Sequence, residues 1–323
     1  MLRYTIKRLL NLIPVALGVT LIIFTLLYIT PGDPVKMMLG ENIDQETYEM
    51  MREQMGLNDS FLQRYLRYVD DLFLHFDMGT SYTTKQPVIT EILTCTPNTL
   101  KLTACSMAVA IVLGLFLGVI AAIRQNGIAD SIISMVSLIG ISFPSFWLGL
   151  MLILFFSVRL KWFPSMGLDS WKAFVLPCTV LAWQSVATLA RMTRSSMLDV
   201  IRQDYVKTAK AKGLGETAII IHHQLKNALI PIITVIGMDI SSLLGGAVVC
   251  ETIFSIQGIG RLMVDSIKRR DYPVVQGCVL FIAIICCVVN LVVDLLYMWA
   301  DPKMKPAGGS RHRKEKEETE DEG

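Results

Sequence analysis

Six long apolar runs constrain the fold of this chain more than any other feature of its sequence. Each run approaches or exceeds the roughly 20 residues that a helix needs to cross a hydrocarbon core; they cover residues 9–29, 102–123, 132–158, 173–190, 228–250 and 274–299. Apolar residues make up 53% of the chain and charged residues only 18%. This balance leaves too little charged surface for a soluble protein. The sequence therefore predicts an all-α membrane protein with six transmembrane helices.

The basic residues predict which ends of these helices face the cytoplasm. Segments 1–8, 124–131 and 191–227 hold more Lys and Arg than the short loops 159–172 and 251–273, and short basic loops stay on the cytoplasmic side. Both termini are therefore expected in the cytoplasm. The first run is longer than the apolar region of a signal peptide and no small-residue cleavage site follows it, so we interpret it as an uncleaved span.

Four regions follow from these boundaries. Residues 1–30 form the N-terminus and first transmembrane helix, 31–99 an extracytoplasmic helical segment, 100–305 a core with helices 2–6 and the inner loop 191–227, and 306–323 a tail. The extracytoplasmic segment begins with the turn Pro31-Gly32-Asp33-Pro34 and shows helical patterns over 45–54 and 61–76. The tail has mixed charges and no apolar residue after Ala307, which predicts disorder.

Motifs that carry catalysis or hold a metal are missing from the sequence. His222 and His223 are adjacent, so on a helix they point in different directions and cannot share a metal ion. The seven cysteines form no C-x-x-C pair, and no Gly-Lys dipeptide is present for a phosphate-binding loop. The net charge of +2 is too small to indicate a nucleic-acid partner. We therefore expect no catalytic residue, metal or cofactor in this chain.

Three of the polar residues within the apolar runs are candidates for function, because an ionisable or amide side chain is costly there. Asp239 is in the fifth run, and Asn290 and Asp294 lie one helical turn apart in the sixth. They either line a translocation path or form interhelical hydrogen bonds that fix packing. For Asp294, proximity to the cytoplasmic interface is a further interpretation, and the structural explanations are favoured there.

The inner loop has the pattern of a short helix followed by a turn. Val206 and Ala209 fall on one helical face and Lys207 and Lys210 on another. Gly213 is well placed to end this helix in the left-handed conformation. A second helix is expected from about residue 216 towards the fifth run. The small alanines favour docking into a groove over the alternative, a basic helix lying on anionic lipid.

These residues resemble a known family. Segment 205–213, with 227–231 beyond it, resembles the "EAA" coupling loop of ABC-importer permeases, and the chain as a whole is similar to the first permease subunit of the dipeptide/oligopeptide/nickel group. Further segments support the resemblance in order along residues 1–305: 31–34, 191–197, 251–254, 258–261, 270–276 and 290–297 followed by Asp301-Pro302. The chain departs from the family pattern at Lys207-Thr208-Ala209, in place of Glu-Ala-Ala, and at Ile256-Gln257, in place of the usual Trp-Pro. The outer loop after Val158 is short, as in oligopeptide, glutathione and nickel members, so it does not identify the cargo.

The resemblance implies a type I ABC importer permease fold and a role as half of a translocation pore. It implies a second permease subunit (a heterodimer), two cytoplasmic ATPases that bind ATP and Mg, an extracytoplasmic substrate-binding protein, and surrounding membrane lipid. It assigns Glu251, Gly258 and Gly260 to an outer gate region. It assigns coupling to the ATPase to the following residues: Tyr205, Lys207, Thr208, Ala209, Ala211, Gly213, Asn227 and Pro231.

The resemblance leaves the cargo open. The main expectation is import of di- and oligopeptides across a bacterial or archaeal cytoplasmic membrane, with nickel, glutathione or another small solute as the alternative. A different class of protein, an ion-coupled secondary transporter, needs a buried ion site, for which Asp239 is the only well-centred carboxylate.

Overall fold

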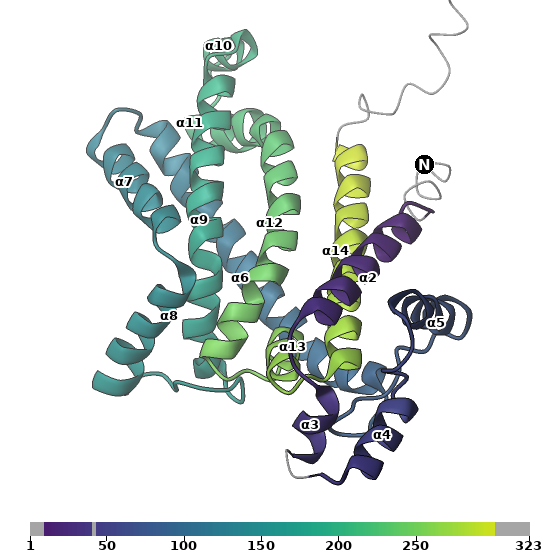
Figure 1. Cartoon of the computed structure of the whole chain (residues 1–323). Helices are drawn as coiled ribbons and strands as arrows, with labels where there is room; N and C mark the ends of the chain where they lie inside the picture. Colours follow the sequence, from purple (N-terminus) through teal and green to yellow (C-terminus); the bar gives the residue numbers. More distant parts are fainter. Residues whose placement is uncertain (1–9, 41–42, 301–323) are drawn as a thin grey trace, which may run out of the picture.

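The long helices of this chain run between two ends of the molecule (Figure 1). The structure is a computed structural model, and it describes residues 10–40 and 43–300. Five described helices are long and apolar enough to cross a membrane: α2 (Leu12–Ile29), α6 (Val88–Ile123), α9 (Trp171–Ile201), the 231–253 part of α12 (Lys226–Ile253) and the 272–295 part of α14 (Tyr272–Ala300). A bent helix pair supplies a sixth candidate. The predicted disordered tail, 306–323, lies outside the described residues.

The apolar run over 132–158, predicted as one membrane-crossing helix, is broken into two arms. The chain forms α7 (Ile128–Ser142), then α8 (Ser145–Leu152) and the π-helix η1 (Ile153–Arg159), and the two arms meet at an angle of 102°. The break lies at Phe143-Pro144, where both residues have extended ψ angles of 130° and 134°. A proline forces the preceding residue out of the helical region and removes a backbone donor. Hydropathy alone does not register this break.

Helix α6 begins at Val88, fourteen residues before the predicted start of the second span at Leu102. The predicted extracytoplasmic segment 31–99 therefore ends inside this helix. Its first turns carry polar residues such as Glu91 and Asn98, which a hydropathy boundary excludes although they continue the same helix. Likewise, α9 continues past the predicted end at Ala190 to Ile201.

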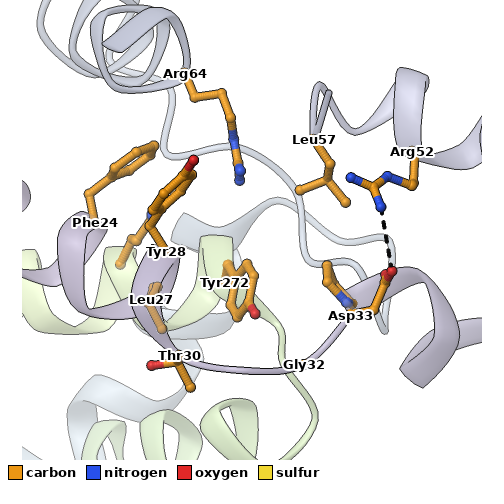
Figure 2. A pocket seen from close by; sticks show the side chains of 12 residues that line it. Phe24, Leu27, Tyr28, Thr30, Gly32, Asp33, Arg52, Leu57, Arg64 and Tyr272 are labelled. Atoms are coloured by element: carbon orange, nitrogen blue, oxygen red, sulfur yellow. Dashed lines mark ion pairs between the residues drawn. The ribbon is translucent and has the colours of Figure 1, made fainter. Parts of the chain in front are cut away.

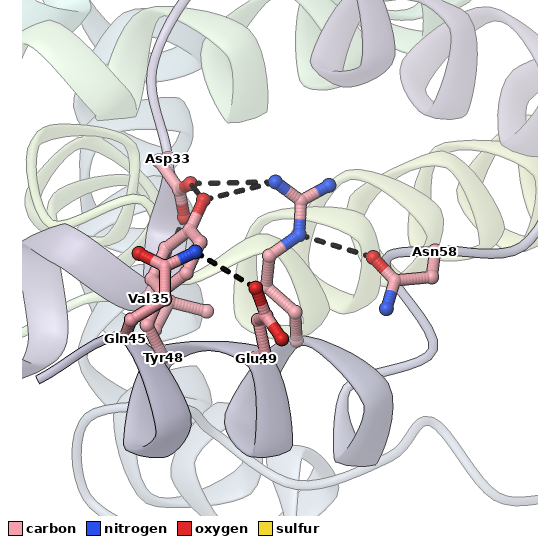
Figure 3. A network of polar contacts seen from close by, with 7 residues as sticks. Asp33, Val35, Gln45, Tyr48, Glu49 and Asn58 are labelled. Atoms are coloured by element: carbon pink, nitrogen blue, oxygen red, sulfur yellow. Dashed lines mark hydrogen bonds and ion pairs between the residues drawn. The ribbon is translucent and has the colours of Figure 1, made fainter.

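The helical patterns predicted over 45–54 and 61–76 are confirmed as α4 (Gln45–Gln54) and α5 (Phe61–Leu74), which follow the short α3 (Pro34–Leu39). Asp33 joins α3 to α4 (Figure 3). Its carboxylate accepts a hydrogen bond from the Val35 N–H (2.9 Å) and one from the Tyr48 hydroxyl, and lies 3.8 Å from an Arg52 nitrogen. Partial burial raises the pKa of Asp33, but these hydrogen bonds and the Arg52 charge outweigh it and hold the pKa below its usual value.

The centre of the molecule is built on close packing of α6 against α9. A Cβ atom added at Gly114 would lie 2.6 Å from the Leu189 Cβ, and one added at Gly118 would lie 2.5 Å from the Thr193 Cβ. The two glycines, one turn apart, therefore let the helix backbones approach closely. Buried apolar side chains from α6, α9 and α12 form the main core around this contact.

A second core lies at one end of the molecule, where α6 and α14 begin. Val88 and Ile92 of α6 pack with Ile259 of α13 (Ile259–Lys268) and with Val274 and Cys278 of α14. Helices α3 and α4 lie at this end too (Figure 1). The short helix α10 (Asp204–Ala211) lies at the opposite end, towards which the C-terminal part of α14 points.

Candidate functional site

Helix α10 covers most of the predicted coupling segment. It ends as predicted: Gly213 has a left-handed φ of +76°. The Gly213 N–H bonds to the Lys210 carbonyl (3.0 Å) and the Leu214 N–H to the Ala209 carbonyl (3.4 Å), which is the paired pattern of a glycine-terminated helix. Glycine is required there by its backbone conformation and not by crowding, because nothing lies within 4 Å of an added Cβ.

The two faces of α10 have different surroundings. Val206 and Ala209 share one face as predicted, and they are 1% and 6% exposed because they pack against Ile219 of the returning chain. Ala209 is therefore turned into this chain, and the expectation that it touches a docking groove is not supported by its position. The outward face consists of exposed residues that do remain available for a partner: Tyr205, Lys207, Thr208 and Ala211.

The chain returns from α10 to the membrane as one uninterrupted helical stretch. It passes through α11 (Glu216–Ala218) and the π-helix η2 (Ile219–Leu225) into α12. The Asn227 side chain donates a hydrogen bond to the His223 carbonyl (2.7 Å), and Pro231 lies inside α12, at the start of its membrane-crossing part. Asn227 and Pro231 are thus in the connection that follows α10 and not in its exposed surface.

Asp239 lines a polar cavity of about 160 Å³ between α8, α9 and α12. Its Oδ2 atom is buried and accepts no hydrogen bond from the described residues. The cavity is also lined by a set of neutral polar side chains: Ser145, Gln184, Ser185, Thr188 and Ser242. A buried carboxylate with unused acceptor capacity in such a setting can bind a cation or a donor group.

Asn290 and Asp294 do not join this cavity. The Ser241 hydroxyl donates a hydrogen bond to the Asn290 side-chain oxygen (3.0 Å), which links α12 to α14. For Asn290, this contact matches the packing interpretation of the sequence. Asp294 is half-buried in the last turn of the membrane-crossing part of α14.

Glu251 lies at the junction of α12 and α13 and is fully buried. Its carboxylate accepts hydrogen bonds from the Thr99 hydroxyl (2.6 Å) and the Arg261 N–H (3.1 Å). The Thr99 oxygen in turn accepts the Ile259 N–H (2.9 Å). Ile259 and Arg261 belong to the first turn of α13, so a negative charge from α12 and a hydroxyl from α6 satisfy the free donors of that turn.

The two predicted gate glycines lie against this carboxylate. A Cβ atom at Gly258 would come within 2.2 Å of the Glu251 carboxyl group, and one at Gly260 within 2.4 Å of the Val248 Cα. Both positions exclude any side chain. Ile256, which stands where the family usually has Trp, is 1% exposed and its N–H donates to the Glu251 carbonyl (2.9 Å). The structure thus brings the predicted residues into one tight junction.

An ion pair that the sequence did not predict joins α7 to α9. The Arg194 guanidinium donates to both oxygens of Asp130, at 2.5 and 2.7 Å, and Asp130 is 4% exposed. Arg194 and Arg191 also line a cavity of about 640 Å³ between α7, α9 and α12. Thr188 lines this cavity and the Asp239 cavity, so the two adjoin along α9. The pairing joins residues 64 positions apart, and spacing within the sequence carries no signal for it.

Comparisons with known proteins identify this arrangement. Residues 114–306 match the family described as binding-protein-dependent transport system inner membrane component, and residues 1–103 match its N-terminal family. The chain belongs to this family. The glutathione transport system permease protein GsiC of Pectobacterium atrosepticum is 41% identical over 305 residues, and that of Escherichia coli K12 is 40% identical; each alignment covers 94% of this chain and 99% of the relative.

Solved structures support the same fold. A structure of the MetNI methionine ABC transporter in inward-facing conformations has a TM-score of 0.56 and is 19% identical, covering 66% of this chain and 97% of that one. An amino acid ABC transporter has a TM-score of 0.50 at 17% identity, covering 67% and 95%. The predicted ABC importer permease fold is therefore confirmed.

The chain is thus a permease subunit of a bacterial ABC importer and a multi-pass inner-membrane protein. It is a transport component and not an enzyme, and its family carries no cofactor of its own. Membership implies ATPase and binding-protein partners in general. The alternative of an ion-coupled secondary transporter is set aside by the family.

Proposed function

We propose that this permease imports glutathione or a closely related short peptide. The observation that carries the proposal is the 40–41% identity to glutathione transport permeases along 99% of their length. Glutathione was an alternative to the broader expectation of di- and oligopeptides, and the relatives favour it. Glutathione is itself a tripeptide, so the proposal narrows the peptide expectation, and nickel has no comparable support.

The partners and orientation follow the same proposal. The chain forms half of the pore with a second, different permease subunit, and two cytoplasmic ATPases and an extracytoplasmic binding protein complete the importer. Both termini and α10 face the cytoplasm, where α10 meets the ATPases. α13, α3 and α4 lie at the extracytoplasmic end, which agrees with the basic residues of the inner loops.

Movement passes from the ATPase to the pore through α10. The exposed residues Tyr205, Lys207, Thr208 and Ala211 contact the ATPase, while Val206 and Ala209 fasten α10 to η2. Because the chain is helical without a break from Glu216 to Ile253, a displacement of α10 is transmitted directly to α12. This helix carries Asp239 near its middle and Glu251 in its last turn. ATP binding and hydrolysis would then shift the pore between two states of different substrate affinity.

The substrate path follows the two adjoining cavities along α9. Asp239 supplies a negative charge in one, and Arg191, which forms no ion pair with a described residue, supplies a positive charge in the other. Glutathione carries one ammonium and two carboxylate groups, so both cavities offer a group of opposite charge to part of it. The junction of Glu251, Gly258 and Gly260 forms the outer gate region beyond the Asp239 cavity.

The substrate assignment is tested on the binding protein that works with this permease. Calorimetry with glutathione, dipeptides, oligopeptides and nickel should give the tightest binding for glutathione. Tighter binding of a longer peptide or of nickel would reject the assignment and leave the importer class intact.

The coupling assignment is tested with Ala211→Trp, which adds bulk on the outward face of α10. Uptake and ATP hydrolysis stimulated by the binding protein should be lost while membrane insertion is retained. Ile128→Trp is the control, because Ile128 is 81% exposed at the start of α7 and is not part of α10. Equal uptake by both variants would refute coupling through this face.

The path assignment is tested with Asp239→Asn. It should raise the glutathione concentration needed for half-maximal uptake and leave ATP hydrolysis without substrate unchanged. Ser241→Ala is the control, because Ser241 is on the same helix but faces Asn290. The same effect in both variants would indicate altered packing of α12 and not a lost substrate contact.

A further inference from the structure

Helix α5 has an apolar face that the rest of the chain leaves uncovered. Leu62 and Leu66, one turn apart, are 61% and 56% exposed, and the half-buried Val69 and Phe73 continue the same stripe. Just after the helix, Phe76 is 88% exposed. Leucines and a phenylalanine gathered in this way usually mark a surface that meets something other than water.

A second face of α5 packs on α2 and fixes where the helix lies. The Phe61 and Tyr65 rings contact the Phe24 ring, with centroids 5.3 and 5.5 Å apart. The Tyr65 hydroxyl donates a hydrogen bond to the Leu17 carbonyl (3.2 Å) and lies 3.4 Å from the Thr20 hydroxyl. These contacts hold the first half of α5 against the middle of α2.

This position puts α5 beside the membrane-crossing helix and not beyond its end. Leu17 is twelve residues before the end of α2 at Ile29, which is about 18 Å along the helix axis. Because α2 runs obliquely to α9 and α14 (Figure 1), the depth of this contact below the end of α2 is smaller than that length. α2 as a whole is an apolar span with little of its surface buried. Figure 1 shows α5 level with the C-terminal part of α2, whereas α3 and α4 lie past the end of that helix.

The charged side of α5 faces the segment formed by α3 and α4, which we call the polar cap. Arg64 points into a pocket of about 250 Å³ between α2, α4 and α14, near Asp33, Arg52 and Tyr272 (Figure 2). Arg67 pairs with Asp59 at 2.6 Å. Arg64 is about 160° around the helix from Leu62 at 100° per residue, so charges and leucines lie on opposite sides. A helix of this kind lies in the plane of a membrane interface.

We infer that α5 is embedded in the lipid interface, with Leu62 and Leu66 against acyl chains and Arg64 and Arg67 on the side of the polar cap. The occupant of the apolar face is lipid because α5 packs on an apolar span whose surface is largely exposed, and Leu17 and Leu21, beside the contact with α5, are 36% and 44% exposed. Part of the predicted extracytoplasmic segment 31–99 is therefore a membrane anchor. The inference does not depend on the substrate.

The test compares two adjacent positions of equal exposure in the chain. L66C and R67C are labelled with a charged, membrane-impermeant maleimide in nanodiscs of phosphatidylethanolamine and phosphatidylglycerol. Labelling is read by mass spectrometry on the peptide 61–74, which contains no native cysteine. Leu66 is 56% exposed and the Arg67 side chain 59%. L66C should react about tenfold more slowly, because a low-dielectric environment disfavours the reactive thiolate.

The measurement is made on the full chain alone and on the assembled importer. Slow labelling of L66C both in the chain alone and in the assembled importer supports contact of this face with lipid. L62C, on the same face, should also be labelled slowly. Slow labelling only in the assembly would mean that a protein partner covers the face, and equal rates for L66C and R67C would mean that water does. Either result overturns the inference, and neither bears on whether glutathione is transported.

Discussion

Replacing Gly258 by alanine should destabilise the permease at the junction of α12 and α13. The backbone of Gly258 is extended, with φ −116° and ψ 177°, so alanine suits its conformation. The obstacle is space, because the new Cβ would lie 2.2 Å from the buried Glu251 carboxyl group. The carboxylate must move away from its hydrogen-bond donors.

The size of the effect follows from those donors. The carboxylate accepts hydrogen bonds from the Thr99 hydroxyl at 2.6 Å and the Arg261 N–H at 3.1 Å. A hydrogen bond to a charged group contributes about 1.5–3 kcal/mol. Loss of one, with the charge still buried, predicts a decrease of about 3 kcal/mol in the free energy of unfolding. At about 2–4 °C per kcal/mol, the unfolding temperature should fall by roughly 6–12 °C.

The assay is thermal unfolding of the purified permease in detergent. Gly245→Ala is the matched control, because Gly245 lies in α12 with nothing within 4 Å of an added Cβ. Alanine in a helix interior is favoured over glycine by about 0.5–1 kcal/mol, so this variant should be unchanged or slightly more stable. An unfolding temperature for Gly258→Ala equal to that of the control would refute the proposed crowding at Glu251.

Three further results are expected. Asp130→Asn should lower the free energy of unfolding by about 3 kcal/mol. This value is at the low end for a broken buried ion pair, because the Arg194 side chain is 29% exposed. A denaturation curve identical to that of the native protein would contradict this prediction. The pKa of Asp33 is lowered in the folded state, so its stabilisation is present above the usual pKa of about 4 and is lost as the pH falls below it. The difference in unfolding temperature between native and Asp33→Asn protein should therefore disappear in acid, and a difference that grows there would reverse the sign. Gly213→Ala should speed amide hydrogen exchange over residues 204–213 by about tenfold, because an alanine in the left-handed conformation costs about 1–2 kcal/mol. Gly213→Asn should have a smaller effect. Equal exchange rates in the two variants would argue against a left-handed residue at the end of α10.

Features fixed by local chemistry were predictable from the sequence. Gly213 ends α10 as expected, because a left-handed residue after a helix is nearly always glycine or asparagine. The break in the third apolar run had a visible cause in Pro144, but the length of the run and its hydropathy hid it. The start of α6 was misplaced because apolarity reports where a helix meets lipid and not where its hydrogen bonds begin.

Features that depend on distant residues were not predictable. Glu251 stood out as part of a motif, yet its partner Thr99 lies 152 residues earlier in the chain. Asp130 had no signal at all, since its role depends on Arg194 in another helix. Ala209 was placed on the correct face of α10, but only the fold shows that this face turns inward against Ile219. Such contacts depend on how the helices run and pack against one another, and the spacing of residues within one segment does not predict that arrangement.

Uptake by the complete importer in proteoliposomes tests the central claim most directly. The permease is reconstituted with its second permease subunit, ATPases and binding protein, and labelled glutathione is added outside with ATP enclosed on the ATPase side. We expect accumulation that requires ATP and the binding protein and persists when a protonophore removes the proton gradient. Uptake that continues without ATP and stops with the protonophore would contradict an ATP-driven permease.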